Sequence, residues 1–527
     1  MKILVSDSLE QRCIDILLSE GFEVDNKPGI PANELASIIG EYDGLVVRSA
    51  TKVTADVLRE AKKMKIIGRA GTGVDNIDTA AATRRGILVM NTPGGNTVSA
   101  AEHTISMMLA LARNIPQANK SMIEGRWDRK KYVGTEVLEK TIGIVGLGKI
   151  GREVASRCRG LGMKTIGYDP VLAKDVAARE SIEHVTLEDL YRRSDFITLH
   201  TPLTKETKNL LNEETLRNCK KGVRVINCAR GGIVDENALL AALLSGHVAG
   251  AALDVFSEEP PSNKELIGHP HVIATPHLGA STEEAQEKVA VQIAYQIADA
   301  LHGRGYAGVV NGGALHLTMK EEVRPLLQLA EKLGSIVAQA SRGTLKKISI
   351  AGFGDEVVSS MELLRAGVLK GILSHVLQEP VNFINAPFLA DEMGLSVSEQ
   401  RDKDGENFNS LLRVRYETSE EAKEVAGTVY RPSTIRLVRM DGFRLEVRPE
   451  GSLLIYTNLD RPGMLAKVGA ILAKHDVNIA GVSLGRTEIG KNALTVMSID
   501  NEIPPTAWKE LQNQEGISDI RLVQLDV

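Results

Sequence analysis

The chain has 527 residues, enough for three or four domains that each bury a core of their own. Its 63 basic and 68 acidic residues give a net charge of -5 without a basic block, so nothing in the composition favours a nucleic-acid partner. No apolar run approaches the roughly 20 residues of a membrane span, and the apolar start is too short for a signal peptide. The 4 cysteines lack the spacing of a metal site, so we expect isolated thiols, no bound metal and a soluble, cytoplasmic protein.

Short β-rich runs alternate with helical patterns in the first 98 residues. This alternation is typical of a small doubly wound domain, with a parallel sheet between helices. Arg48 and Arg69 each end such a run, and Asn91 and Thr92 follow the next one. Open α/β sheets bind ligands at the carboxyl ends of their strands, so these four side chains are candidates for a binding site.

An apolar segment at 100–113 predicts a buried helix that leads into a second domain. Glu102 and His103 lie on this segment. We interpret them as packing or hinge residues rather than metal ligands.

A glycine motif follows at 141–152, where an apolar run leads into Gly-x-Gly-x-x-Gly and then a helical pattern. Gly146 permits the tight turn, Gly148 lets a pyrophosphate approach the backbone, and Gly151 allows the helix to pack closely on the strand. The next β-rich run ends in Asp169, which can bond a ribose diol and repel a 2′-phosphate. The motif therefore predicts NAD rather than NADP; the alternative is a similar turn for another nucleotide or for no ligand.

Three further polar residues each follow an apolar run: Arg230, Glu259 and His277. A planar guanidinium can bond both the carboxylate and the carbonyl oxygen of a 2-oxo acid, which lysine cannot do. Imidazole, with an ordinary pKa near neutral, can exchange the proton of the alcohol, and a neighbouring carboxylate would orient the ring. Taken singly, the three could be a solvated arginine, a surface glutamate and a helix-capping histidine. Together, downstream of a cofactor motif, they predict a dehydrogenase active site.

The segments 146–169, 227–232, 252–261 and 275–281 resemble the D-isomer-specific 2-hydroxyacid dehydrogenases. The resemblance implies that Arg230 orients the substrate, that His277 is the acid and base, and that Glu259, which precedes a proline, supports it in preference to Glu258. It also implies an NAD site lined by Thr72, Gly146, Gly148, Lys149, Ile150, Gly151, Asp169, Thr201, Cys228, Ala229, Arg230, Asp254, His277, Leu278, Gly279 and Ala280. Cys228 would be oxidation-sensitive if exposed and inert if packed.

Within that family, the segments 46–51 and 68–76 are similar to the branch that acts on 3-phosphoglycerate. This similarity implies oxidation to 3-phosphohydroxypyruvate, the first step of L-serine synthesis, in a homodimer or homotetramer. Arg48 and Arg69, with Asn91 and Thr92, would then bind the substrate, because one arginine cannot bind both a phosphate and a carboxylate. The alternatives are solvated arginines and a different activity, either a hydroxypyruvate or glyoxylate reductase or an NAD-sensing corepressor-like protein. The aromatic and basic segment 127–132 resembles the dimer contact of the family, or is a solvated loop.

The chain beyond residue 312 has no second glycine motif, and segments such as 343–350 and 435–447 look like sheet. The order of elements in the last part is βαββαβ, and its Asp-Arg-Pro-Gly and Val-Asn-Ile segments resemble the ACT amino-acid-binding module. Asp460 at a helix start and Asn478 beside it can bond an amino acid such as L-serine, with help from Asn458. The alternative is an ACT fold that serves only oligomerisation.

We therefore predict an α/β chain with two doubly wound, Rossmann-like domains, an α+β intervening domain and a βαββαβ ACT domain. The substrate-binding domain is expected at 1–98 plus 285–312, because a helix near 283–302 should return the chain to it. The NAD-binding domain is expected at 99–284, the intervening domain at 313–450 and the ACT domain at 451–527.

Overall fold

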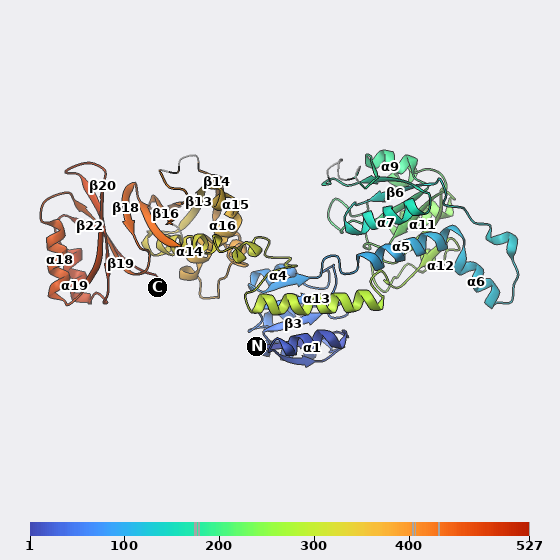
Figure 1. Cartoon of the computed structure of the whole chain (residues 1–527), viewed down its shortest axis with the longest axis horizontal. Helices are drawn as coiled ribbons and strands as arrows, with labels where there is room; N and C mark the ends of the chain where they lie inside the picture. Colours follow the sequence, from blue (N-terminus) through green and yellow to red (C-terminus); the bar gives the residue numbers. More distant parts are fainter. Residues whose placement is uncertain (173–176, 178–179, 403–404, 406, 431–432, 526–527) are drawn as a thin grey trace.

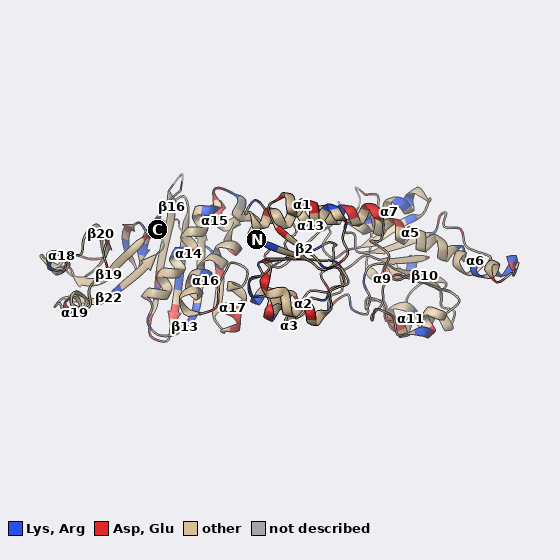
Figure 2. Cartoon of the chain, turned by 90° about the horizontal axis from the view of Figure 1, so that it is seen from below, with Lys and Arg blue, Asp and Glu red and all other residues tan. Residues whose placement is uncertain are grey.

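The computed structural model describes residues 1–172, 177, 180–402, 405, 407–430 and 433–525. The strands in this part of the chain form four sheets that follow one another along an elongated molecule (Figure 1). Figure 2 shows the same row of sheets from a second direction. The sheet of the N-terminal residues lies between the glycine-motif sheet on one side and the two C-terminal sheets on the other.

The N-terminal unit is a five-stranded parallel sheet in the order β2-β1-β3-β4-β5, the doubly wound arrangement predicted from the sequence. The inner strands β1, β3 and β4 are apolar and mostly buried, as the inner strands of a parallel sheet require, whereas the edge strand β2 is polar and partly exposed. The long helix α13 returns from the neighbouring unit and packs Ile293 and Ile297 into the core of this sheet. The elements are β1 (Lys2–Val5), α1 (Gln11–Ser19), β2 (Glu23–Asn26), α2 (Ala32–Ile38), β3 (Gly44–Val47), α3 (Ala55–Glu60), β4 (Ile66–Arg69), α4 (Thr79–Arg84), β5 (Leu88–Asn91) and α13 (Glu283–Leu301).

The glycine-motif unit is a seven-stranded parallel sheet in the order β12-β11-β10-β9-β6-β7-β8. The strand order reverses between β6 and β9, so the sheet has its ligand-binding switch point at the end of β6. The elements are α5 (Thr97–Ala112), α6 (Ile115–Ile123), β6 (Thr141–Val145), α7 (Lys149–Gly160), β7 (Lys164–Tyr168), β8 (Glu183–His184), α9 (Leu187–Arg193), β9 (Phe196–Leu199), α10 (Glu213–Arg217), β10 (Val223–Asn227), α11 (Glu236–Leu244), β11 (Val248–Leu253), α12 (Lys264–Gly268) and β12 (Val272–Ala274).

The third unit has a six-stranded sheet in the order β14-β13-β15-β16-β17-β18, antiparallel except for the β13–β14 pair. Two helices, α14 and α16, pack against each other and bury apolar side chains between themselves and the sheet. The elements are α14 (Val323–Ala340), β13 (Leu345–Phe353), α15 (Asp355–Ser359), α16 (Met361–Val376), α17 (Ala386–Glu392), β14 (Ser396–Arg401), β15 (Leu411–Thr418), β16 (Ala422–Tyr430), β17 (Thr434–Met440) and β18 (Phe443–Val447).

The last unit is a four-stranded antiparallel sheet in the order β20-β21-β19-β22 with two helices on one face. The other face of the sheet carries Leu453, Ile455 and Val523 into the same core as α14 of the third unit. The third and fourth units are therefore one continuous packing unit on this side. The elements are β19 (Gly451–Leu459), α18 (Met464–Lys474), β20 (Ile479–Arg486), β21 (Asn492–Ile499), α19 (Pro505–Gln512) and β22 (Ile517–Leu525).

These sheets confirm the predicted fold class: two Rossmann-like units, an α+β unit and a βαββαβ unit. The exact domain boundaries stay a prediction. Over the described residues, none of the helices is both long and apolar enough to cross a membrane.

Candidate active site

The histidine and the glutamate predicted to act together are in contact. His277 Nδ1 lies 3.0 Å from Glu259 Oε2, and the backbone N–H of Phe256 donates to the other oxygen of that carboxylate at 3.2 Å. His277 follows β12 in the left-handed region, with φ 58°, and its backbone N–H donates to the carbonyl of Asp254 at 2.9 Å. Glu259 orients the ring from the Nδ1 side and leaves Nε2 for a substrate.

The predicted substrate arginine bridges the two Rossmann-like units. Arg230 follows β10, and its Nε donates to Asp75 Oδ2 of the N-terminal unit at 3.0 Å. Its Nη1 donates to the carbonyl of Ala229 at 2.7 Å. The side chain of Asp75 is 70% exposed, so water screens the pair and a carboxylate ligand can replace Asp75.

Arg48 and Arg69 of the N-terminal unit lie near Arg230 at this boundary. Burial, together with the neighbouring charges of Arg230 and Arg48, lowers the pKa of Arg69 to about 10. Arg69 Nε donates to Asn76 Oδ1 at 2.9 Å, and Arg48 Nη1 donates to Gln286 Oε1 at 3.1 Å. These amide oxygens orient the guanidinium groups without neutralising them. The structure thus brings the predicted cations together in an arrangement that an anion would stabilise.

Asn91 and Thr92 lie next to the arginines and support the loop after β4. Asn91 Nδ2 donates to the carbonyl of Thr72 at 2.5 Å, and Thr72 Oγ1 donates to Asn96 Oδ1 at 2.7 Å. Thr92 is fully buried, and its Oγ1 has no hydrogen-bond partner among the described residues. Asn96, which sequence analysis did not single out, therefore belongs to the same polar network.

The glycine turn after β6 fits a dinucleotide. Gly146 has φ 92°, and a Cβ there would lie 2.5 Å from the carbonyl oxygen of His200. A Cβ at Gly151 would lie 2.0 Å from the carbonyl oxygen of Gly146, so only glycine allows this approach of helix and strand. No described atom lies within 4 Å of a Cβ built at Gly148, directly before α7. The backbone at Gly148, at the start of α7, is therefore open on the side where a Cβ would lie, and a pyrophosphate can approach the helix N-terminus there.

The acid at the end of β7 lies against the glycine turn. Asp169 accepts hydrogen bonds from the backbone N–H groups of Leu147 at 2.9 Å, Val171 at 2.9 Å and Leu172 at 3.0 Å. Burial alone would raise the pKa of Asp169, but these bonds lower it below its ordinary value. The carboxylate is charged at neutral pH and can accept a bond from a ribose hydroxyl. Across the turn, the buried Thr201 Oγ1 has no partner among the described residues.

A second carboxylate, Asp254, holds the loop that carries His277. It is fully buried, and its oxygens accept bonds from Thr275 Oγ1 at 2.6 Å and from the N–H groups of Leu278 at 2.7 Å and Gly279 at 2.9 Å. His103 Nε2 of α5 lies 3.1 Å from the same carboxylate. His103, expected to be a packing or hinge residue, therefore contacts Asp254. The sequence could not show this contact, because no local pattern identifies Asp254 as its partner.

The remaining predicted NAD residues lie at the same edge of the seven-stranded sheet. Burial raises the pKa of the Cys228 thiol to about 12, which supports an inert, packed cysteine. Five others begin α7 or follow β10 and β12: Lys149, Ile150, Ala229, Leu278 and Ala280.

The predicted effector residues are not all brought together. Asp460 accepts bonds from Arg486 at 3.2 Å and from the backbone N–H of Gly490 at 3.0 Å, at the carboxyl end of β20. Asn478, directly before β20, donates to Asp500 at 2.6 Å. The expectation that Asn478 lies beside Asp460 is therefore wrong within one chain, because the full length of β20 separates them. Asn458 is buried and accepts from Thr495 at 3.0 Å, inside the sheet.

Comparisons with known proteins agree with this architecture. Family models match residues 105–279 (D-isomer specific 2-hydroxyacid dehydrogenase, NAD binding domain), 322–441 (D-3-phosphoglycerate dehydrogenase intervening domain) and 452–516 (ACT domain). The D-3-phosphoglycerate dehydrogenase of Synechocystis sp. is 44% identical over 99% of this chain and 95% of its own length. That of Homo sapiens is 44% identical over 97% of each chain. The chain belongs to the D-3-phosphoglycerate dehydrogenases.

The family assignment identifies the chain as an NAD-dependent oxidoreductase, with NAD as its cofactor. A solved glyoxylate reductase from Paecilomyes thermophila matches with a TM-score of 0.55 and 28% identity, over 59% of this chain and 98% of that one. The reductase thus resembles only part of the chain, whereas the phosphoglycerate dehydrogenases match it along nearly its full length.

The charge on Asp169 allows a test of cofactor choice. We expect Asp169→Ala to narrow the preference for NAD over NADP, because the carboxylate that repels a 2′-phosphate is removed. The measurement is kcat/KM for each cofactor in the wild type and the variant. Asp189→Ala, which removes an exposed carboxylate on α9, is the control. Equal use of the two cofactors by the wild type would contradict the role given to Asp169.

Proposed function

We propose that this chain oxidises 3-phospho-D-glycerate to 3-phosphohydroxypyruvate with NAD, the reaction that opens L-serine synthesis. The observation that carries the proposal is the cluster of Arg48, Arg69 and Arg230, in which burial and then the positive charges of Arg230 and Arg48 lower the pKa of Arg69. A substrate with both a phosphate and a carboxylate supplies enough anionic oxygens for three guanidinium groups. The full-length similarity to D-3-phosphoglycerate dehydrogenases supports the same substrate.

In the proposed mechanism each charged side chain has a separate task. Arg230 exchanges Asp75 for the substrate and binds its carboxylate and its C2 oxygen, while Arg48 and Arg69 bind the phosphate. His277 Nε2 accepts the proton of the C2 hydroxyl, and Glu259 stabilises the imidazolium that forms. The glycine turn and Asp169 would hold NAD, which would supply the acceptor for the hydride of C2. Because the substrate residues come from both Rossmann-like units, closure of the units around the substrate would exclude water.

A steady-state assay tests the activity. The chain should reduce NAD with 3-phosphoglycerate and should have a much lower kcat/KM with D-glycerate, which lacks the phosphate. A higher kcat/KM for NADH-dependent reduction of glyoxylate or hydroxypyruvate would establish the alternative reductase. Absence of turnover with all four substrates, combined with tight NADH binding, would establish the NAD-sensing alternative.

We further propose that the C-terminal unit binds L-serine and reduces activity through feedback. The support is chemical: Asp460 and Arg486 place a carboxylate and a guanidinium together at one end of β20, as an amino-acid zwitterion requires. The N–H of Gly490 and the Arg486 guanidinium lower the pKa of Asp460, which keeps it charged at neutral pH.

We expect Asp460→Ala to abolish inhibition by serine while kcat without serine stays near the wild-type value, because the residue lies outside the catalytic units. An effector acts through its differential affinity for two states, worth about 1–3 kcal/mol in typical systems. The measurement is the serine concentration at half inhibition, with Asp476→Asn as control, because asparagine tolerates the positive φ of 57° at this exposed position. Asn478→Ala is measured in parallel. Because Asn478 and Asp460 lie far apart within one chain, an equal loss of serine inhibition in this variant would mean that one serine site is formed by Asp460 of one chain and Asn478 of another. Serine inhibition that persists in Asp460→Ala would contradict the proposed site.

We propose a homo-oligomer whose contact includes the arm formed by α6 and the segment after it. Large apolar side chains on this arm are exposed, including Ile123 at 79%, Trp127 at 72% and Val133 at 79%. Apolar groups gathered in this way on a surface mark interaction sites. Sedimentation of the full chain measures the oligomeric state; a monomer at micromolar concentration would contradict the proposed homo-oligomer.

We also propose a cytoplasmic location, which the free cysteines of the described residues support.

A further inference from the structure

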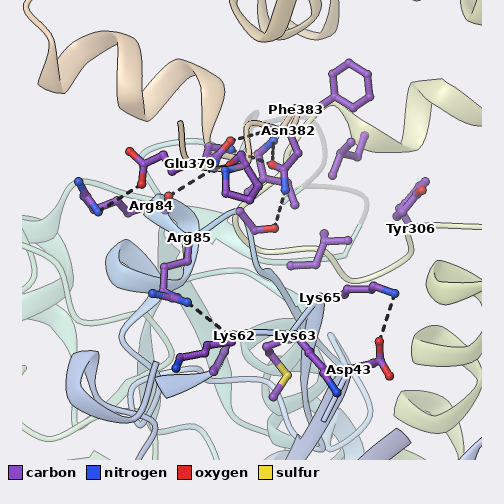
Figure 3. A pocket seen from close by; sticks show the side chains of 18 residues that line it. Asp43, Lys62, Lys63, Lys65, Arg84, Arg85, Tyr306, Glu379, Asn382 and Phe383 are labelled. Atoms are coloured by element: carbon purple, nitrogen blue, oxygen red, sulfur yellow. Dashed lines mark hydrogen bonds and ion pairs between the residues drawn. The ribbon is translucent and has the colours of Figure 1, made fainter. Parts of the chain in front are cut away.

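A cavity of about 840 Å³ lies between the N-terminal unit and the third unit (Figure 3). Its volume is within the range of small-molecule sites, roughly 300–1,000 Å³. The N-terminal unit contributes residues after α3 and α4, and the third unit contributes the segment 379–385.

The two walls of the cavity differ in chemistry. One wall carries five basic side chains, all from the N-terminal unit: Lys62, Lys63, Lys65, Arg84 and Arg85. Acidic groups offset only part of this charge. Asp43 lies 3.1 Å from Lys65 Nζ, and Glu392 and Glu379 lie 3.0 Å and 3.9 Å from Arg84.

Three of the basic groups have no acidic partner among the described residues. Within the described part of the chain, the ammonium groups of Lys62 and Lys63 make no hydrogen bond or ion pair, and Arg85 donates only to the carbonyl of Ala61 at 3.5 Å. The opposite wall presents apolar surface from Leu315, Phe383 and Ile384. A ligand that fits both walls has an anionic group and a carbon skeleton.

The walls are held in place by direct hydrogen bonds between the units. Asn382 Nδ2 donates to the carbonyl of Gly86 at 2.8 Å, and Asn385 Nδ2 donates to the carbonyl of Arg84 at 3.4 Å. A Cβ at Gly86 would overlap the Asn382 amide, so the two segments approach as closely as glycine allows. The cavity is therefore a defined gap beside an ordered contact.

We propose that this cavity is a second anion site, which binds a small phosphorylated metabolite between the catalytic unit and the third unit. A phosphate group faces Lys62, Lys63 and Arg85, which are the cations without an acidic partner, and the carbon skeleton faces Phe383 and Ile384. Lysine binds phosphate as a point charge and arginine as a fork, so this set suits a doubly charged group better than a single carboxylate.

The position of the cavity connects it to the active site. Lys65 directly precedes β4 and Leu88 begins β5, whereas Arg69 and Asn91 end the same two strands in the proposed substrate site. Each strand has four residues, so the two sites are about 13 Å apart along the sheet at roughly 3.3 Å per residue. A ligand in the cavity contacts both units and so is sensitive to how they pack.

Tungstate, a heavy-atom analogue of phosphate, locates anions directly in crystals of the full chain. We expect an anomalous peak in the cavity of the wild type and of the control Lys221→Ala/Lys346→Ala, which removes two exposed lysines elsewhere. The peak should be absent in Lys62→Ala/Lys63→Ala. These lysines are exposed and unpaired, so their removal should leave folding unchanged. A wild-type peak confined to Arg48, Arg69 and Arg230 would overturn the proposal.

Calorimetric titration with inorganic pyrophosphate gives the affinity in solution. We expect Lys62→Ala/Lys63→Ala to weaken one class of site by about tenfold or more, and the control pair to leave it within about twofold. Unchanged binding in Lys62→Ala/Lys63→Ala would show that these lysines are only solvated, and would overturn the assignment. Neither experiment depends on turnover, so failure here and failure of the proposed function are distinguishable.

Discussion

Replacing His277 by alanine should lower kcat by about two to four decades, the range that general acid-base catalysis contributes. The affinity for NADH, measured by fluorescence titration, should stay near the wild-type value. In the proposed mechanism the ring's Nε2 accepts the substrate proton, whereas the proposed NAD site is formed mainly by the glycine turn, Asp169 and the α7 N-terminus. A variant that loses NADH binding would show that His277 is a cofactor or folding residue.

The backbone conformation of His277 determines which substitution is a suitable control for this prediction. Its φ of 58° lies in the left-handed region, where alanine is strained by about 1–2 kcal/mol and asparagine is tolerated. His277→Asn therefore removes the base without this strain and should lose as much kcat as His277→Ala. A large difference in kcat between the two variants would show that the loss in His277→Ala comes from strain in the loop that carries residue 277, rather than from removal of the imidazole. Glu259→Gln should cost roughly tenfold or more, and Glu258→Gln, beside it in the sequence, should not.

The contact between Glu259 and His277 could be predicted from sequence because it depends on local rules. Glu259 and His277 follow β11 and β12, which are neighbours in a parallel sheet, and the ends of parallel strands meet at one edge. The same rule predicts that Asp169 lies by the glycine turn. The structure brings His277 within 3.0 Å of Glu259, as the pattern indicated.

Contacts between residues far apart in the sequence could not be predicted in this way. Asp75 is 155 residues from Arg230, and His103 is far in sequence from its partner Asp254. Each contact depends on how two distant elements pack, and no local pattern marks it. The cavity beside Asn382 escaped sequence analysis for the same reason.

The C-terminal unit shows a different limit. The order of its elements is as predicted, but the two motifs that carry Asp460 and Asn478 are not close in space, because the length of β20 separates these residues. The sequence also did not show that Leu453, Ile455 and Val523 share a core with α14. Deleting 452–527 would expose that core to water, so point variants test feedback more cleanly than truncation.

The second large effect is expected at Arg230. Arg230→Lys keeps the charge but removes the planar fork, so kcat/KM for 3-phosphoglycerate should fall by about two to three decades, as when one donor to a developing oxyanion is lost. Arg217→Lys, the same substitution at an exposed ion pair on α10, should change kcat/KM by less than about twofold. Steady-state kinetics with saturating NAD measures both variants.

The division of this loss between kcat and KM tests the geometry. If Arg230 bonds the C2 oxygen as well as the carboxylate, part of its contribution is made only in the transition state, and kcat must fall together with kcat/KM. A rise in KM alone would mean that Arg230 only anchors the carboxylate. Asp75→Asn tests the ion pair between Asp75 and Arg230 that is present without substrate. In the proposed mechanism the substrate displaces the Asp75 carboxylate from Arg230, so removal of that negative charge should lower KM or leave it unchanged. A rise in KM for Asp75→Asn would instead show that Asp75 holds Arg230 in its productive position and is retained when substrate binds.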